Sequence, residues 1–77
     1  MCDPIHLLRQ EPSLNMARFY RLELHPDLFG GRVLVRHWGR IGTRGNERRI
    51  WFGDDTAALA ARDKWRDRKV RRGYVTQ

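Results

Sequence analysis

Arginine is the residue type in this sequence that is best suited to bind a ligand. Of its 77 residues, 16 are Lys or Arg and 9 are Asp or Glu, which gives a formal net charge of +7. The only lysines are Lys64 and Lys69, so guanidinium groups carry nearly all of the positive charge. A guanidinium group binds phosphate through two parallel hydrogen bonds and also stacks on flat rings. A small basic domain of this kind is typical of proteins that bind nucleic acid, and less often of proteins that bind acidic proteins or membrane surfaces.

The sharpest candidate site is a tryptophan surrounded by arginines. An exposed tryptophan can stack on a base or sugar while neighbouring guanidinium groups bind phosphates. The alternative is that Trp38 is a core residue, or that it lies under an arginine in a cation–π contact. The sequence leaves both interpretations open. The predicted nucleic-acid-binding residues are Arg36, Trp38, Gly39, Arg40, Arg44 and Arg48.

A second basic cluster lies near the C-terminus, in residues 66–72 (RDRKVRR). Cations at the end of a helix are favoured by the helix dipole alone. We therefore interpret this cluster as mainly structural, with an auxiliary contact to phosphate as the alternative.

No cofactor, metal site or enzymatic activity is predicted. His6, His25 and His37 lack the spacing of metal ligands, and a single cysteine, Cys2, cannot complete a zinc site. The paired Asp54 and Asp55 are better explained as a helix cap than as an acid and base.

The pattern of apolar residues predicts an α+β fold, a small antiparallel sheet of four to five strands with one α-helix packed across it. Alternating side chains indicate the strands, and an Ala-rich segment with long charged side chains indicates the helix. Trp65 shares one helical face with Ala58 and Ala61, which places it beneath the helix. The predicted strands are residues 5–11, 16–24, 32–40 and 47–52, the helix spans residues 56–72, and residues 74–75 form a possible last edge.

The third strand determines how the candidate site is presented. If Val33 and Val35 face the helix, then Arg36 and Trp38 lie on the opposite face with little cover. Gly39 lies within or at the end of this strand, where a bulge or a close approach of backbone is expected.

The length predicts one domain over residues 1–77, with its core at about residues 5–75 and a flexible end at residues 1–4. No segment has the apolar run of a membrane span or of a signal peptide, so no membrane partner is expected. A single cysteine fits a cytoplasmic protein.

The sequence resembles the WGR domain family, named for the tripeptide Trp-Gly-Arg. The tripeptide occurs in residues 38–42 (WGRIG), after a basic strand. Residues 18–24 (RFYRLEL) resemble the family's aromatic pair and first long strand, and Phe52 stands before the helix. Residues 69–74 (KVRRGY) are similar to its closing lysine and Gly-Tyr. These pieces occur in family order over roughly residues 5–75.

The resemblance implies an antiparallel sheet with one helix and a role in binding DNA ends. In DNA-damage-activated poly(ADP-ribose) polymerases, this domain binds the end of a DNA break. Its motif tryptophan packs on the terminal nucleotide, and its motif arginine links DNA to neighbouring domains. By motif position these residues correspond to Trp38 and Arg40. Small stand-alone bacterial members are the group that this chain resembles most.

Two departures limit what the resemblance implies. The polymerases place an asparagine just before the aromatic pair, where this chain has Ala17 and Arg18, and Asn15 lies further upstream. The sequence also has no polymerase domain or zinc finger, so catalysis is not carried over.

The sequence therefore predicts a non-catalytic module that binds nucleic acid. DNA is favoured over RNA, with DNA ends as the specific target. The alternative is a protein–protein interaction module that recognises an acidic partner.

Overall fold

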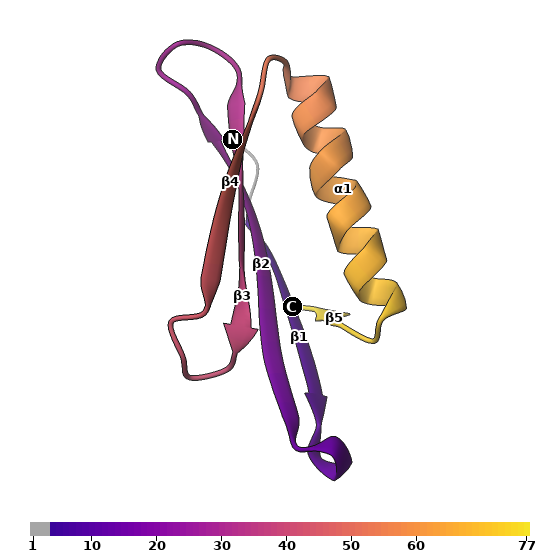
Figure 1. Ribbon diagram of the computed structural model, residues 1–77. Helices are drawn as coiled ribbons and strands as arrows, with labels where there is room; N and C mark the ends of the chain where they lie inside the picture. The colour runs from indigo at the N-terminus through magenta and orange to yellow at the C-terminus, as the bar shows by residue number, and fades with distance from the viewer. Residues whose placement is uncertain (1–3) are drawn as a thin grey trace.

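The computed structural model describes residues 4–77, which form one antiparallel sheet with an α-helix along one of its faces (Figure 1). The strand order is β4-β3-β2-β1-β5, and every neighbouring pair is antiparallel. This arrangement confirms the predicted α+β fold. The elements in chain order are β1 (Ile5–Glu11), the 3₁₀ turn η1 (Pro12–Leu14), β2 (Met16–Pro26), β3 (Arg32–Arg40), β4 (Asn46–Phe52), α1 (Asp55–Arg71) and β5 (Val75–Thr76).

Two hairpins extend from opposite ends of the sheet. The β1–β2 hairpin reaches beyond the C-terminal end of α1 and ends in η1, whereas the β2–β3 turn lies near the N-terminal end of α1 (Figure 1). Asn15 adopts a left-handed conformation at the first turn, with φ 51°. Of the predicted flexible end, residues 1–3 lie outside the described residues.

The core lies between the sheet and α1. Alternate side chains of β2, namely Tyr20, Leu22 and Leu24, point toward the helix and are buried. Leu7 of β1 and Leu34 of β3 extend this apolar layer to both sides, and both are fully buried. Tyr74, predicted to begin the final strand, instead packs into the core just before β5.

The helix begins and ends at the predicted signals. The side chain of Asp54 accepts a hydrogen bond from the backbone N–H of Ala57 at 2.7 Å, which caps the first turn. Asp55 forms an ion pair with Arg32 at 2.9 Å, and this hydrogen bond lowers the pKa of the Asp55 carboxyl group. In the described part of the chain, no helix has the length and apolar character needed to span a membrane.

Trp65 is half-buried on the side of α1 that faces the sheet, as predicted. Its ring stacks on Tyr20 with 6.5 Å between ring centroids, and it packs against the core. The helix therefore contributes one large aromatic surface to a core otherwise formed mainly by strand residues.

The expected orientation of β3 is wrong. Trp38 lies opposite Tyr20, and Leu34 lies opposite Leu24, so Leu34, Arg36 and Trp38 face the helix. The reason is that β3 is apolar on both faces, and its pairing with β2 decides which face enters the core. Val35 is nevertheless 97% buried on the other face, because its neighbours Glu23 and Arg49 cover it.

Two leucines test this assignment of core and surface. Leu34 is 0% exposed and Leu28 is 97% exposed. We expect Leu34→Ala to lower the free energy of unfolding by about 2–5 kcal/mol, because it leaves a cavity in the core. Leu28→Ala removes the same atoms and should change stability by less than about 0.5 kcal/mol. Thermal and urea denaturation measure both, and equal losses would contradict the orientation of β3.

Candidate nucleic-acid interface

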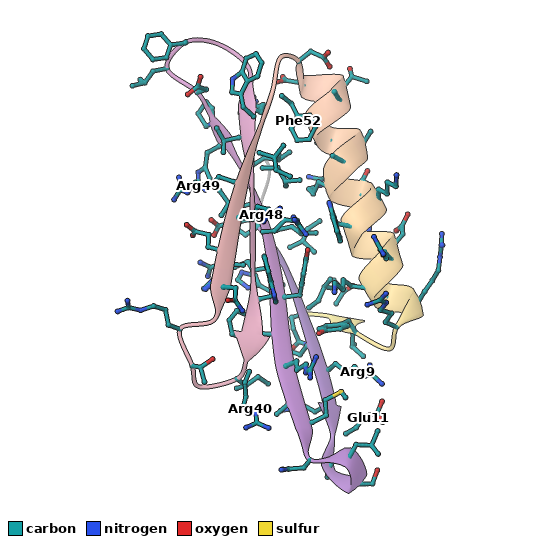
Figure 2. The ribbon with its side chains drawn as sticks, viewed as in Figure 1. Arg9, Glu11, Arg40, Arg48, Arg49 and Phe52 are labelled. Atoms are coloured by element: carbon teal, nitrogen blue, oxygen red, sulfur yellow. The ribbon has the colours of Figure 1, made fainter. Side chains whose placement is uncertain are left out.

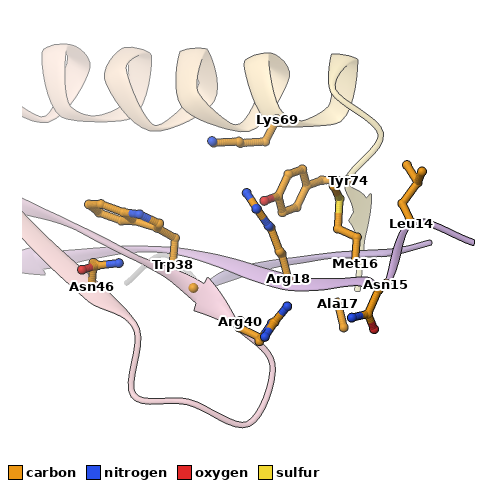
Figure 3. A pocket seen from close by; sticks show the side chains of 11 residues that line it. Leu14, Asn15, Met16, Ala17, Arg18, Trp38, Arg40, Asn46, Lys69 and Tyr74 are labelled. Carbon is orange, nitrogen blue, oxygen red and sulfur yellow. The ribbon is translucent and has the colours of Figure 1, made fainter. Parts of the chain in front are cut away.

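A cavity of about 570 Å³ opens where the β1–β2 hairpin passes the C-terminal end of α1. Its walls come from residues 14–18 and 38–40. Asn46 borders it at the start of β4, and Lys69 and Tyr74 close it from the helix side. Figure 3 shows Trp38 and Asn46 at one end of the cavity and Leu14 and Asn15 at the other. Segments far apart in the sequence thus meet at one site.

Trp38 is both a packing residue and a wall of the cavity. Its ring stacks on the buried Tyr20, with 6.1 Å between centroids and 24° between the ring planes. The guanidinium of Arg36 lies 5.4 Å from the centroid of Trp38. The remaining surface of Trp38 is half-exposed and borders the cavity. Trp38 therefore packs against the core and leaves part of its ring exposed at the cavity.

Arg36 supports the tryptophans from behind the cavity. Its guanidinium lies 3.9 Å from the centroid of Trp65, within the range of a strong cation–π contact. One of its terminal nitrogens donates a hydrogen bond to the hydroxyl of Tyr20 at 3.3 Å. Burial raises the pKa of that hydroxyl, so Tyr20 remains a neutral partner. Arg36 thus positions Trp38 and does not line the cavity itself.

Positive charge in the cavity has no carboxylate to balance it. Arg18, Arg40 and Lys69 all line the cavity, and in the part of the chain that the structure describes, no ion pair joins them to Asp or Glu. Arg18 and Arg40 also lie directly opposite each other on β2 and β3. Like charges in this cross-strand position repel each other, so a bound anion would stabilise the pair.

The surroundings of Lys69 lower its pKa. Partial burial lowers the pKa of its ammonium group, and Arg72, Arg68, Arg36 and Arg18 lower it further. The ammonium nitrogen lies 4.7 Å from the ring centroid of Tyr20 and 5.6 Å from that of Tyr74. The aromatic rings hold the cation in place, but they do not neutralise it. A phosphate in the cavity would favour the charged form of Lys69.

Gly39 lets the loop between β3 and β4 fold against the strand. A Cβ atom at Gly39 would lie 2.7 Å from the Cα of Gly45, which is closer than such atoms approach. Gly39 itself pairs regularly with Phe19, so the close approach that we predicted occurs without a bulge. The loop is also held by His37, whose Nε2 lies 2.6 Å from the carbonyl oxygen of Arg44. The middle residue of the tripeptide therefore has a structural role.

The predicted site residues divide into two groups. Trp38, Gly39 and Arg40 line the cavity, whereas Arg36, Arg44 and Arg48 do not. Figure 2 shows Arg48 farther along β4, well away from Arg40 at the end of β3. Both Arg44 and Arg48 are exposed, and Arg48 lies opposite Arg36 in the sheet.

Sequence reasoning missed several residues of the cavity. Lys69 was interpreted mainly as a helix-end cation, and Asn15 was set aside because it lies too far upstream of the aromatic pair. Both line the cavity, together with Arg18 and Tyr74. The similarity of residues 69–74 to the family's closing segment was the signal that could have identified Lys69 and Tyr74.

The close packing at Gly39 predicts that a single methyl group added at this position destabilises the fold. We expect Gly39→Ala to lower the free energy of unfolding by about 1–3 kcal/mol, because β3 and the loop must move apart. A Cβ at Gly53 would meet its nearest atom at 3.4 Å, an ordinary contact. Gly53→Ala therefore serves as the control and should melt within a few degrees of the parent. Equal melting of both variants would show that the loop is not packed as described.

The lowered pKa of Lys69 predicts a pH-dependent contribution to stability. In the range just below its ordinary value of 10.5, the unfolded chain holds this proton more firmly than the folded one. Stability contributed by Lys69 therefore rises with pH in that range. Lys69→Met removes this rise. Tyr20, whose pKa is raised by burial, also affects stability in this range, but it does so in the parent and in the variant alike. Thermal unfolding between pH 7 and pH 10.5 tests the difference, and parallel curves would contradict it.

The chain is similar to known proteins over nearly its whole length. A family model described as "WGR domain" matches residues 4–77. An uncharacterized protein, y4dW, of Sinorhizobium fredii (strain NBRC 101917 / NGR234) is 40% identical over 70 residues. The match covers 91% of this chain and 34% of that relative, so the chain spans about a third of its length. No solved structure matches the chain. The family match covers nearly all of the chain and includes the tripeptide at the cavity, which shows that the chain belongs to the WGR domain family.

Proposed function

We propose that this protein is a non-catalytic module that binds nucleic acid at the cavity, with the end of a DNA duplex as its target. The observation that carries the proposal is the group formed by Arg18, Arg40 and Lys69, three cations without carboxylate partners beside a half-exposed tryptophan. Elsewhere on the described surface, most carboxylates are paired with arginines. The cavity thus brings three cations without carboxylate partners together beside an aromatic ring that is available for stacking.

The residues of the cavity have distinct roles in this proposal. Arg40 is exposed at the end of β3 and contacts a phosphate near the mouth of the cavity. Arg18, which is also exposed, and the half-buried Lys69 attract the same strand. Trp38 stacks on a base or sugar, and Arg36 and Tyr20 hold its ring in place. Since the cations contact phosphates and the tryptophan contacts a ring, their effects on binding are separable.

DNA ends are favoured because of the family to which the chain belongs. In the polymerase members the same tripeptide binds the end of a DNA break. Here the tripeptide residues Trp38, Gly39 and Arg40 all line one cavity. No catalytic role is assigned to the carboxylates, because those of α1 and the strands serve in ion pairs and in the helix cap.

A second candidate function is protein recognition. Leu28 and Phe29 are 97% and 93% exposed in the β2–β3 turn, at the opposite end of the sheet from the cavity. Adjacent exposed apolar side chains are typical of protein contacts. In this alternative, the cations of the cavity bind an acidic protein segment in place of nucleic acid.

Salt dependence tests the proposal. Neutralisation of about three to five phosphates predicts a log–log salt slope of roughly −3 to −5 for duplex DNA. Arg40→Ala should reduce the steepness of this slope by about one unit. It should not lower the melting temperature, because Arg40 is exposed and its removal relieves repulsion with Arg18. The control is Arg49→Ala, which removes an equal charge from an ion pair with Glu47 on the other face of the sheet.

The control variant should bind DNA with a slope close to that of the parent. Equal changes in both variants would show that binding depends on net charge and not on the cavity. Absence of duplex binding at low salt, with retained binding of poly-glutamate, would favour the protein-recognition alternative.

A further inference from the structure

The size of the cavity distinguishes between ways in which a DNA end could bind. Its volume of about 570 Å³ lies within the range of about 300–1,000 Å³ that is typical of small-molecule sites. One nucleotide is a ligand of that class. A terminal base pair, which comprises two nucleotides and two backbone segments, is a larger ligand than the single nucleotide that this volume fits.

Trp38 provides the cavity with an aromatic ring on which a base can stack. Trp38 borders one end, and Leu14 borders the other, where it remains 62% exposed in η1 (Figure 3). In a duplex, base faces are stacked on one another and unavailable, whereas an unpaired base presents both of its faces. Stacking of such a base on an aromatic ring is a general mode of single-strand recognition.

Two asparagines provide groups for the edge of a base. Asn46 lies directly opposite Trp38 on the neighbouring strand, so the two side chains share one face of the sheet. Asn15 lies at the other end of the cavity, beside Leu14. Within residues 4–77, neither side-chain amide forms a hydrogen bond with another protein group. An amide pairs a donor with an acceptor, as base edges do, and those edges are free only when the base is unpaired.

The cations complete a site for one nucleotide. Arg18 and Arg40 occupy opposite positions in the pairing of β2 with β3, and Lys69 approaches from α1. A phosphate bound near these cations would relieve their mutual repulsion. The cavity therefore combines an anion site with aromatic and amide groups at a spacing set by the sheet.

We propose that the cavity receives a single unpaired nucleotide at the end of a DNA strand, with the base on Trp38, its edge at Asn46 and its phosphate at Arg18 and Arg40. This inference rests on the proposed function and specifies the substrate of the same site. It implies that a one-nucleotide overhang is bound in preference to a blunt end.

The test compares DNA hairpins that have a single open end. One is blunt, one has a one-nucleotide overhang, and one has an overhang with an abasic sugar-phosphate. Fluorescence anisotropy should show that the complete overhang binds about fivefold to 150-fold more tightly than the blunt end, the range expected from stacking of one base. The abasic overhang should lose most of that gain, because it retains only the charge.

A variant pair tests the role of Asn46. Asn46→Leu should reduce the preference for the overhang, measured as the ratio of the affinities for the overhanging and the blunt hairpin. Gln10 is an exposed amide on β1 that does not line the cavity, so Gln10→Leu is the matched control and should preserve the preference. Melting temperatures establish that both variants are folded.

The outcomes separate this inference from the proposed function. Equal binding of blunt and overhanging hairpins would overturn the inference, while the proposed function would stand as long as duplex DNA binds. The inference would also be overturned if the abasic overhang bound as tightly as the complete one. The same holds if Asn46→Leu kept the parent's preference for the overhang. Absence of binding to every hairpin would overturn both proposals.

Discussion

The pairing of β2 with β3 is the constraint on which the rest of the structure depends. It places Tyr20 beside Trp38, and Trp65 of α1 stacks on the same tyrosine. Arg36, from the same face of β3, contacts both tryptophan rings with its guanidinium group. These contacts join the helix to the sheet and hold the half-exposed ring of Trp38 in a defined orientation. The core and the candidate site are therefore parts of one aromatic cluster and cannot be altered independently.

The same pairing concentrates positive charge. It sets Arg18 against Arg40, and the end of α1 brings Lys69 to the same cavity. In the unbound protein these cations repel one another. The pKa of Lys69 is lowered mainly by burial and further by Arg72, Arg68, Arg36 and Arg18. Residues arranged for binding often reduce stability in the absence of the ligand. A polyanion would remove this cost, which links the stability of the domain to its occupancy.

Much of the candidate site could be predicted from local sequence. Trp38 and Arg40 were identified from their types and from the family tripeptide, and both line the cavity. Arg44 and Arg48 were included only because they are basic and nearby in sequence, and they lie outside it. Lys69 was missed because a cation in the last turn of a helix has a sufficient local explanation. Its distance of 31 residues from Trp38 in the sequence conceals that both reach one cavity.

The sequence by itself determined the order of the strands and the helix, and their bounds to within two residues, because alternation, turn residues and the Asp54 cap are local signals. It did not determine which face of β3 enters the core. Val33 and Val35 alternate with Leu34 and Trp38, so both faces of that strand are apolar, and local periodicity cannot distinguish them. The orientation of β3 is resolved only by its pairing with β2. Tyr20, Leu22 and Leu24 of β2 are buried beneath the helix, and the residues of β3 that lie opposite them face the helix as well. A strand with two apolar faces takes its orientation from its neighbours, because a shift of one residue in register would exchange the faces.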